Sequence, residues 1–221
     1  MSLDEPVHRY LAHALHGGAE RASGVRLAMR GRIKVGTWLP FTASQECDGR
    51  SFVWRARVGF GRVTLLTVLD RFADGAGSTE GRLFGRRRTF GAEGEDTTRS
   101  AAGRAALESV FAPMSLLPGR GVAWRAESDE IVVAAFDVPP ERPEIRLRID
   151  GEGALLSASA LRWRDREAGY VACGCEVRAE RRFGDVVVPG SVRVGWWFGT
   201  PRYAPFFEAE VTELAPIGGA G

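Results

Sequence analysis

Apolar and polar side chains alternate between residues 24 and 35, and this pattern restricts the fold more than any other feature of the sequence. The apolar set, with one glycine, is Val25, Leu27, Met29, Gly31, Ile33 and Val35. The intervening set is mainly basic: Arg26, Ala28, Arg30, Arg32 and Lys34. Successive side chains of a β-strand point to opposite faces, so the pattern predicts a long strand with one dry and one solvated face. Such strands are typical of antiparallel sheets that bury one face.

Similar segments follow along the chain and predict about eleven strands in two runs, at about 24–90 and about 121–214. The segment 63–72 is apolar at nearly every position, and we expect it to be covered on both faces. Asp74-Gly75 is a hairpin-type turn sequence. In the segment 153–164, Leu161 and Trp163 are assigned to the dry face, and Arg162 to the solvated face.

Two helices are predicted around the first run of strands. The N-terminal helix covers about 4–16, with Asp4 as its cap and Pro6 in its first turn. The mid-chain helix covers about 96–112 and is rich in alanine, and Pro113 should stop it. Small residues let a helix approach a sheet closely, so we expect this second helix to cover the dry face.

These elements predict one domain, 1–221, of the mainly β (α+β) class. With 221 residues, 44% of them apolar, the chain can bury a substantial core. A sheet of about eleven strands curls or closes rather than staying flat. We therefore expect a large curved antiparallel sheet or incomplete barrel, with the two helices covering its concave face.

Charge and hydropathy argue against several partners. The net charge is +2, from 30 basic and 28 acidic residues, so no overall field attracts a nucleic acid. The stripes of arginine are explained by cross-strand arginine–glutamate pairs. No apolar run approaches 18 residues, so no membrane span is expected. The N-terminal segment lacks the pattern of a signal peptide, and the expected localisation is cytoplasmic.

The histidines and cysteines indicate neither a metal site nor a cofactor. All three histidines lie in the first predicted helix, where His13 and His16 lack a third strong ligand. A histidine general base on the sheet is thereby excluded. Cys47, Cys173 and Cys175 have no partners at metal-binding spacing and are explained as small buried residues.

Aromatic residues supply the candidates for a ligand-binding surface. The six tryptophans and twelve phenylalanines either fill the core or line a cavity, and the sequence cannot separate these two roles. The candidate lining residues are Trp54, Trp163, Trp196, Phe52 and Phe111.

Three polar residues are candidates for a functional group. Asp70 stands in an otherwise almost wholly apolar segment, so it needs a partner or an altered pKa, and we expect an arginine. Glu108 and Arg104 complete the polar group; Asp74 is a further acidic candidate. No catalytic residue is assigned.

Four stretches resemble bacterial proteins grouped as a domain of unknown function. They are MRGRIKVGTWLPFTASQ, RFADGAGSTEGRLFG, SAAGRAALESVFAPMSLLPGRGVAW and RRFGDVVVPGSVRVGWWFGT. The family's helical block has a small residue, arginine, glutamate, an aromatic residue, proline and paired leucines before a tryptophan. The matching positions here are Arg104, Glu108, Phe111, Pro113, Leu116, Leu117 and Trp124. The sequence departs from the family at Ala112, where an aromatic residue would precede the proline. The resemblance covers most of the chain and implies no catalytic residues.

The order of elements also resembles the half-barrel of bacterial lipoprotein carriers and related lipid-binding proteins, as a matter of fold. Those carriers are usually exported, whereas no export signal is expected in this sequence. This difference weakens the likeness in function. Three hypotheses remain. The first is a non-enzymatic protein that binds an apolar or amphipathic small molecule in the concave face. The second is an enzyme that uses Glu108, Arg104 and Asp70. The third is a structural or assembly module that forms a homodimer through an edge strand or apolar patch.

Overall fold

The computed structural model describes residues 3–218; the first two and last three residues of the predicted domain lie outside this part. Thirteen strands form one antiparallel sheet in the order β6-β5-β4-β3-β2-β1-β13-β12-β11-β10-β9-β8-β7. The mainly β class is confirmed, but the count of about eleven strands was too low. A weaker strand was predicted as far as Leu83-Phe84, where β5 lies, but β6 was not predicted as a separate strand, because its charged sequence shows no clear alternation.

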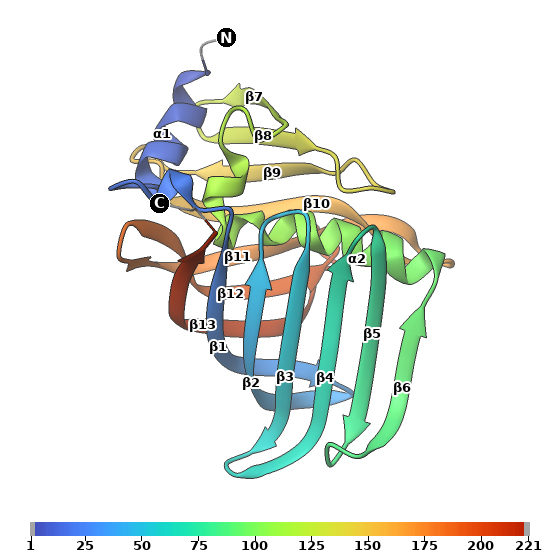
Figure 1. Ribbon diagram of the computed structural model, residues 1–221. Coiled ribbons are helices and arrows are strands. Elements are labelled where there is room, and N and C mark those ends of the chain that lie inside the picture. Colours follow the sequence, from blue (N-terminus) through green and yellow to red (C-terminus); the bar gives the residue numbers. More distant parts are fainter. Residues whose placement is uncertain (1–2, 219–221) are drawn as a thin grey trace.

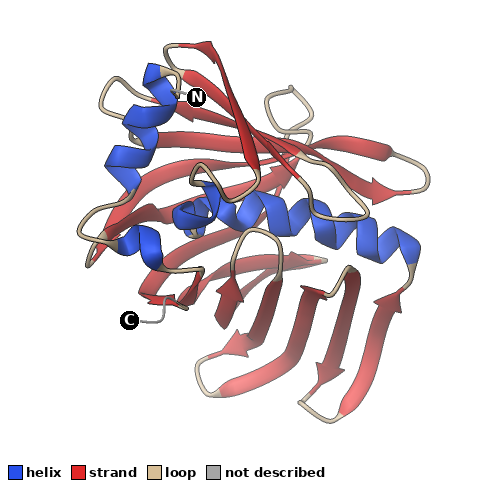
Figure 2. Cartoon of the chain, turned by 45° about the horizontal axis from the view of Figure 1, so that its top comes forward, coloured by secondary structure: helices blue, strands red, loops and turns tan. Residues whose placement is uncertain are grey.

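The two runs of strands join through β1 and β13, so the sheet is continuous. The bounds are β1 Gly24–Val35, β2 Thr37–Cys47, β3 Phe52–Phe60, β4 Val63–Ala73, β5 Ala76–Leu83, β6 Arg87–Glu93, β7 Val122–Ser128, β8 Ile131–Phe136, β9 Glu144–Ile149, β10 Leu155–Asp165, β11 Gly169–Phe183, β12 Val186–Trp196 and β13 Ala204–Ile217. The sheet curls so that the two runs have different directions, and helix α2 lies across its inside (Figures 1 and 2).

Helix α1, Glu5–Ala14, packs against β7, β8 and β12 at one end of the sheet. It buries Val7, Tyr10, Leu11 and Ala14, which share one face at helical spacing. A short 3-10 turn, Ala19–Arg21, leads into β1. Among residues 3–218, no helix is long and apolar enough to cross a membrane.

Helix α2, Glu95–Leu107, contacts β4, β5 and β6 of the first run and β10 of the second. It ends earlier than predicted, and two 3-10 turns follow, Glu108–Phe111 and Pro113–Leu116. Alanines and Gly103 form its buried face. A Cβ at Gly103 would lie 3.0 Å from Cγ of Arg162, so glycine here lets the arginine stem pass beneath the helix.

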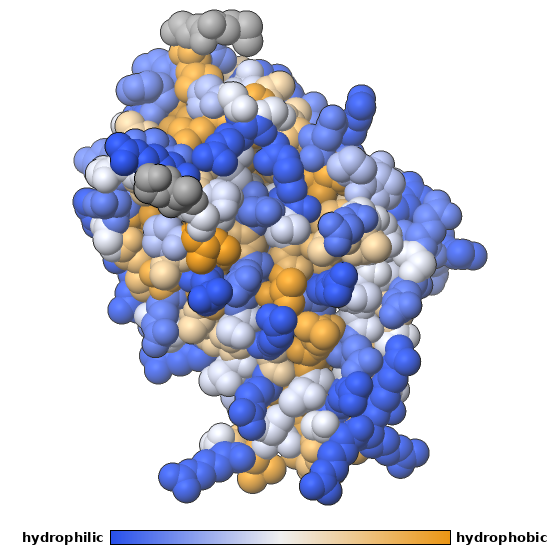
Figure 3. Space-filling view, in the orientation of Figure 1, coloured by the Kyte–Doolittle hydropathy of each residue, from blue (hydrophilic) through white to orange (hydrophobic). Residues whose placement is uncertain are grey.

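The alternation predicts the buried face of the first strands correctly and fails at two later places. In β1 and β2, the buried residues fall at every second position except towards the β1–β2 hairpin. The hairpin at Asp74-Gly75 is confirmed, with positive φ at both residues. The outer face of β4 is not covered, because no other layer packs on that side and Leu69 is 39% exposed. Figure 3 shows this face, where hydrophobic patches lie among hydrophilic residues.

The second failure concerns β10, where Leu161 is 66% exposed and Arg162 lies on the inner side against α2. The inner set of this part of β10 is Ala158, Ala160 and Arg162, at period two. Alternation identifies the two faces of a strand, but it does not state which face is covered. Here the covered face holds the small alanine side chains and the aliphatic stem of Arg162 beneath α2, whereas the bulkier Leu161 faces solvent.

Candidate functional site

A cavity of about 350 Å³ lies between the inner face of the sheet and α2 with its following turn. We call it the inner cavity. Its wall is mostly apolar, and it takes residues from both runs of the sheet. From α2 and the turn come Leu107, Val110 and Phe111; from β12 and β13 come Val192, Val194, Trp196, Phe206 and Phe207. The helix therefore does not seal the concave face but leaves space beside itself.

Small residues on β11 explain why this space exists. The stretch of β11 in the wall is Cys173, Gly174 and Cys175, which have little side-chain volume. A larger residue at position 174 would be strained, because its Cβ would lie 2.7 Å from both the carbonyl oxygen of Ala158 and Cγ of Phe198.

The structure divides the five aromatic candidates between the wall and other positions. Trp54, Trp196 and Phe111 line the inner cavity. Phe52 is fully buried outside the wall, with the guanidinium of Arg104 4.3 Å above its ring. Trp163 lies away from the cavity, 5.3 Å from the ring of Tyr170. The guanidinium of Arg99, from α2, lies 4.3 Å from the centre of the Trp163 ring.

A row of polar residues crosses the inner face of the first run. Gln45, Trp54, Asp70 and Thr79 are direct neighbours on β2, β3, β4 and β5, and all four line the inner cavity. Neighbours in register point to the same face, so this row forms a polar belt on an otherwise apolar wall.

Arg104 links the three polar candidates into one cluster above this belt. Its Nε donates to Oε1 of Glu108 at 2.6 Å, one helical turn along the chain, and its Nη1 donates to Oδ2 of Asp70. Gln45 donates from Nε2 to the other oxygen of Glu108 at 2.6 Å. The predicted arginine partner of Asp70 is confirmed. The guanidinium also lies 5.3 Å from the ring of Trp54.

The ionisation of this cluster follows from burial and pairing. Burial raises the pKa of Glu108, and the nearby Arg104 opposes this shift without cancelling it. Burial lowers the pKa of Arg104, but Glu108 and Asp70 outweigh it, so its pKa lies above the ordinary value. Both oxygens of Glu108 already accept hydrogen bonds. The arrangement therefore suits a structural ion network better than a general base that must reach a substrate.

The cysteines near the cavity are not activated nucleophiles. Burial raises the pKa of Cys47, and it raises that of Cys175 to about 12. A thiol with such a pKa stays protonated at neutral pH, whereas the thiolate is the reactive form. Within residues 3–218, no group of three histidine, cysteine or acidic side chains could hold a metal ion. His13 instead lies 2.7 Å from the carboxylate of Glu180.

A second, polar cavity of about 500 Å³ adjoins the inner one, and we call it the vestibule. The two cavities share Asp70, Thr79 and Arg162 as lining residues. The remaining vestibule residues are Asp96, Thr97, Ser100, Ala101, Arg164, Asp165 and Arg166. Sequence reasoning missed Arg162 as a site residue because it assigned this arginine to the solvated face. The available signal was its period-two spacing from the small residues Ala158 and Ala160.

The sequence matches a family model described as a family of unknown function, DUF6920, over residues 1–215. Among curated proteins, none matches the chain.

Solved structures provide likenesses of fold. A domain from Vibrio parahaemolyticus described as an outer membrane lipoprotein-sorting protein has 10% identity and a TM-score of 0.49, over 97% of this chain and 92% of that chain. A DUF1329 family protein from Desulfovibrio piger has 11% identity and a TM-score of 0.49, over 99% and 96%. A LolA superfamily protein from Nitrosomonas europaea has 4% identity and a TM-score of 0.50, over 98% and 93%. The resemblance to a family of unknown function is confirmed by the family model, and the fold is similar to that of the LolA superfamily protein.

Proposed function

Because this chain belongs to DUF6920, a family of unknown function, we propose its role from its cavity: it is a non-enzymatic protein that binds an apolar or amphipathic small molecule in the concave face of its sheet. The observation that carries this proposal is the mostly apolar inner cavity of about 350 Å³ beside α2. Small-molecule sites of this kind have volumes of roughly 300–1,000 Å³ and apolar walls with a few polar groups.

The composition of the wall supports this role. Trp54, Trp196 and Phe111 offer apolar surface, and a ligand that covers it gains from the hydrophobic effect. The polar belt and Arg104 lie at one side of this surface, where a polar end of the ligand would find partners. Val35 and Phe90 of the wall are about half exposed, so the inner cavity opens to solvent on their side.

Native mass spectrometry of gently purified protein tests this proposal. We expect a co-purifying lipid-sized mass, together with binding of the apolar fluorophore N-phenyl-1-naphthylamine. Val194→Phe should weaken both by narrowing the inner cavity, whereas Leu161→Phe on the exposed side of β10 should leave both unchanged. A folded wild-type protein that carries no such mass and binds no fluorophore would refute the proposal.

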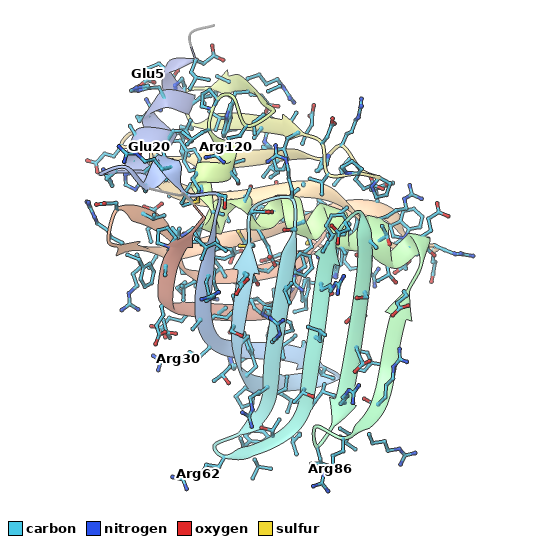
Figure 4. All side chains as sticks on the ribbon, viewed as in Figure 1. Glu5, Glu20, Arg30, Arg62, Arg86 and Arg120 are labelled. Carbon is cyan, nitrogen blue, oxygen red and sulfur yellow. The ribbon has the colours of Figure 1, made fainter. Side chains whose placement is uncertain are left out.

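The interaction-module hypothesis has one observation in its favour. β6 is an edge of the sheet, and all seven of its residues are exposed. Phe84 beside it is also exposed, and Arg86 projects from the tip of the β5–β6 hairpin (Figure 4). The arginines Arg87 and Arg88 on the edge itself oppose pairing, since charges are a common protection of edge strands. A dimer measured by light scattering, and lost on Thr89→Pro, would favour this second function over the first.

For the compartment, we propose the cytoplasm. Support comes from Cys47, Cys173 and Cys175, which are all free thiols, as proteins in reducing compartments usually have. Cell fractionation with an antibody to the chain tests this, and recovery from an oxidising compartment would contradict it.

A further inference from the structure

The three arginines of the vestibule differ in their partners. Arg166 forms an ion pair with Asp96 at 2.7 Å, and Arg164 forms one with Asp165 at 3.5 Å. Arg162 has no carboxylate within ion-pair distance among residues 3–218, although it lies between the inner cavity and the vestibule. A cation that lacks a close anion in this position forms a binding site for an anionic group of a ligand.

The protein holds Arg162 in place through neutral groups. Its Nε donates to the carbonyl oxygen of Ser100 at 2.8 Å, and its Nη2 donates to the hydroxyl of the same residue at 3.2 Å. The guanidinium lies 5.0 Å from the ring of Trp196, and the one partner of Nη1 among residues 3–218 is the sulfur of Cys173, at 3.9 Å. Sulfur is a weak acceptor, so Nη1 retains its capacity to bind a stronger one.

A second unpaired donor lies on the same wall. The indole nitrogen Nε1 of Trp54 is buried and has no hydrogen-bond partner in the described part of the chain, and this side chain is 3% exposed. Buried polar groups are normally paired, so a lone N–H in a cavity wall is a site for an acceptor. Among the acidic acceptors of the wall, both oxygens of Glu108 and Oδ2 of Asp70 already accept hydrogen bonds from Arg104 and Gln45. The wall thus offers two donors that lack a strong acceptor.

From these contacts we infer that the ligand is a single-chain amphiphile with an anionic oxygen head group, a carboxylate or a phosphate monoester. Its head pairs with Arg162 at the boundary of the two cavities, and its chain lies in the inner cavity. A volume of about 350 Å³ is near the lower end of ligand sites, which favours one chain over two. This inference rests on the proposed function and specifies the ligand of the same site.

Competition with N-phenyl-1-naphthylamine tests the head group, with ligands below their micelle concentrations. Hexadecanoate, hexadecyl phosphate and 1-hexadecanol share one chain and differ in the head. We expect the wild type to bind at least one anionic ligand about tenfold more tightly than the alcohol, as a charge-assisted hydrogen bond provides. The anion that binds more tightly, hexadecanoate or hexadecyl phosphate, identifies the head group. Arg162→Gln should remove the preference and leave hexadecanol binding unchanged, and Arg162→Lys should retain part of it.

Arg166→Gln is the matched control, because it removes an exposed vestibule arginine that is already paired, and the preference should persist. Equal binding of alcohol and anions by the wild type, or a preference that survives Arg162→Gln, overturns the inference and leaves the proposed function intact. Failure of folded wild-type protein to bind any of the three ligands overturns both. If Arg162→Gln does not fold by circular dichroism, a diminished anion preference in Arg162→Lys supports the inference, and an undiminished anion preference in that variant counts against it.

Discussion

Replacement of Arg104 by methionine should destabilise the protein strongly and in a pH-dependent way. Methionine keeps a similar length and can still pack near Phe52 and Trp54, but it removes the cation that pairs with Asp70 and Glu108. The two carboxylates would stay in the cavity wall with Gln45 as their one remaining side-chain donor. An uncompensated buried charge is far costlier than the loss of an ordinary contact.

The magnitude follows from burial. The side chains of Arg104, Asp70 and Glu108 are 19%, 23% and 11% exposed, so solvent screens them little. Removal of one partner of a buried pair costs about 3–5 kcal/mol. The exposed pair of Arg30 and Glu210 is the matched control, with side chains 65% and 47% exposed and Arg30 pointing into solvent (Figure 4). Arg30→Met should cost at most about 1 kcal/mol.

Urea unfolding at pH 7 and at about pH 4.5 measures both the size of the destabilisation by Arg104→Met and the sign of its pH dependence. The pKa of Glu108, already raised by burial, rises further without the guanidinium. A carboxyl whose pKa is higher in the folded state stabilises that state below the unfolded pKa, near ~4.3, and this contribution is lost as the pH rises. The deficit of Arg104→Met should therefore shrink by about 1.4 kcal/mol or more on acidification. A cost below about 1 kcal/mol, or one independent of pH, would refute the reasoning.

Three further predictions concern packing and reactivity. Gly103→Val should push the stem of Arg162 away from α2 and lower the free energy of unfolding by about 1–3 kcal/mol, measured with urea. Gly31→Ala should disrupt the pairing of β1 with β13 through a backbone clash and lower the melting temperature, whereas Gly151→Ala, with open space around it, should not. Cys175, with its pKa raised by burial to about 12, should resist iodoacetamide at pH 8 until urea unfolds the chain, as mass spectrometry would show.

Period-two alternation made much of the fold predictable, because it depends on local geometry. It identified β1 and β2 and their buried faces, and glycine after aspartate located the hairpin at residues 74–75. β5 and β6 were underestimated since their exposed or glycine-rich positions carry no contrast between faces. The orientation of β10 was wrong because it depends on which layer covers the strand, and that is a tertiary property.

The site was predictable in part, because some of its contacts also depend on local geometry. Arg104 and Glu108 are four residues apart on a helix, so their contact follows from local geometry. Asp70 was recognised as needing an arginine, but which arginine depends on how α2 lies across β4. The spacing of Arg162 from Ala158 and Ala160 could have placed it on the inner face, but the lack of partners at Arg162 and at the nitrogen of Trp54 could not be recognised, because an unsatisfied group is defined by what surrounds it in space.

The existence of the inner cavity follows from the dimensions of α2 and of the sheet. A helix of 13 residues is about 20 Å long, whereas thirteen strands at a spacing of about 4.8 Å give a sheet about 60 Å wide. The helix can cover only about a third of the dry face, so the sheet must curl until its two runs cover each other. Alanines and Gly103 bring α2 close to β10 on one side. The wall beside the helix includes Cys173, Gly174 and Cys175, whose side chains have too little volume to close the gap. A small helix on a wide curved sheet therefore leaves an apolar cavity beside it, and the polar belt with Arg162 places the charged end of that cavity at the vestibule.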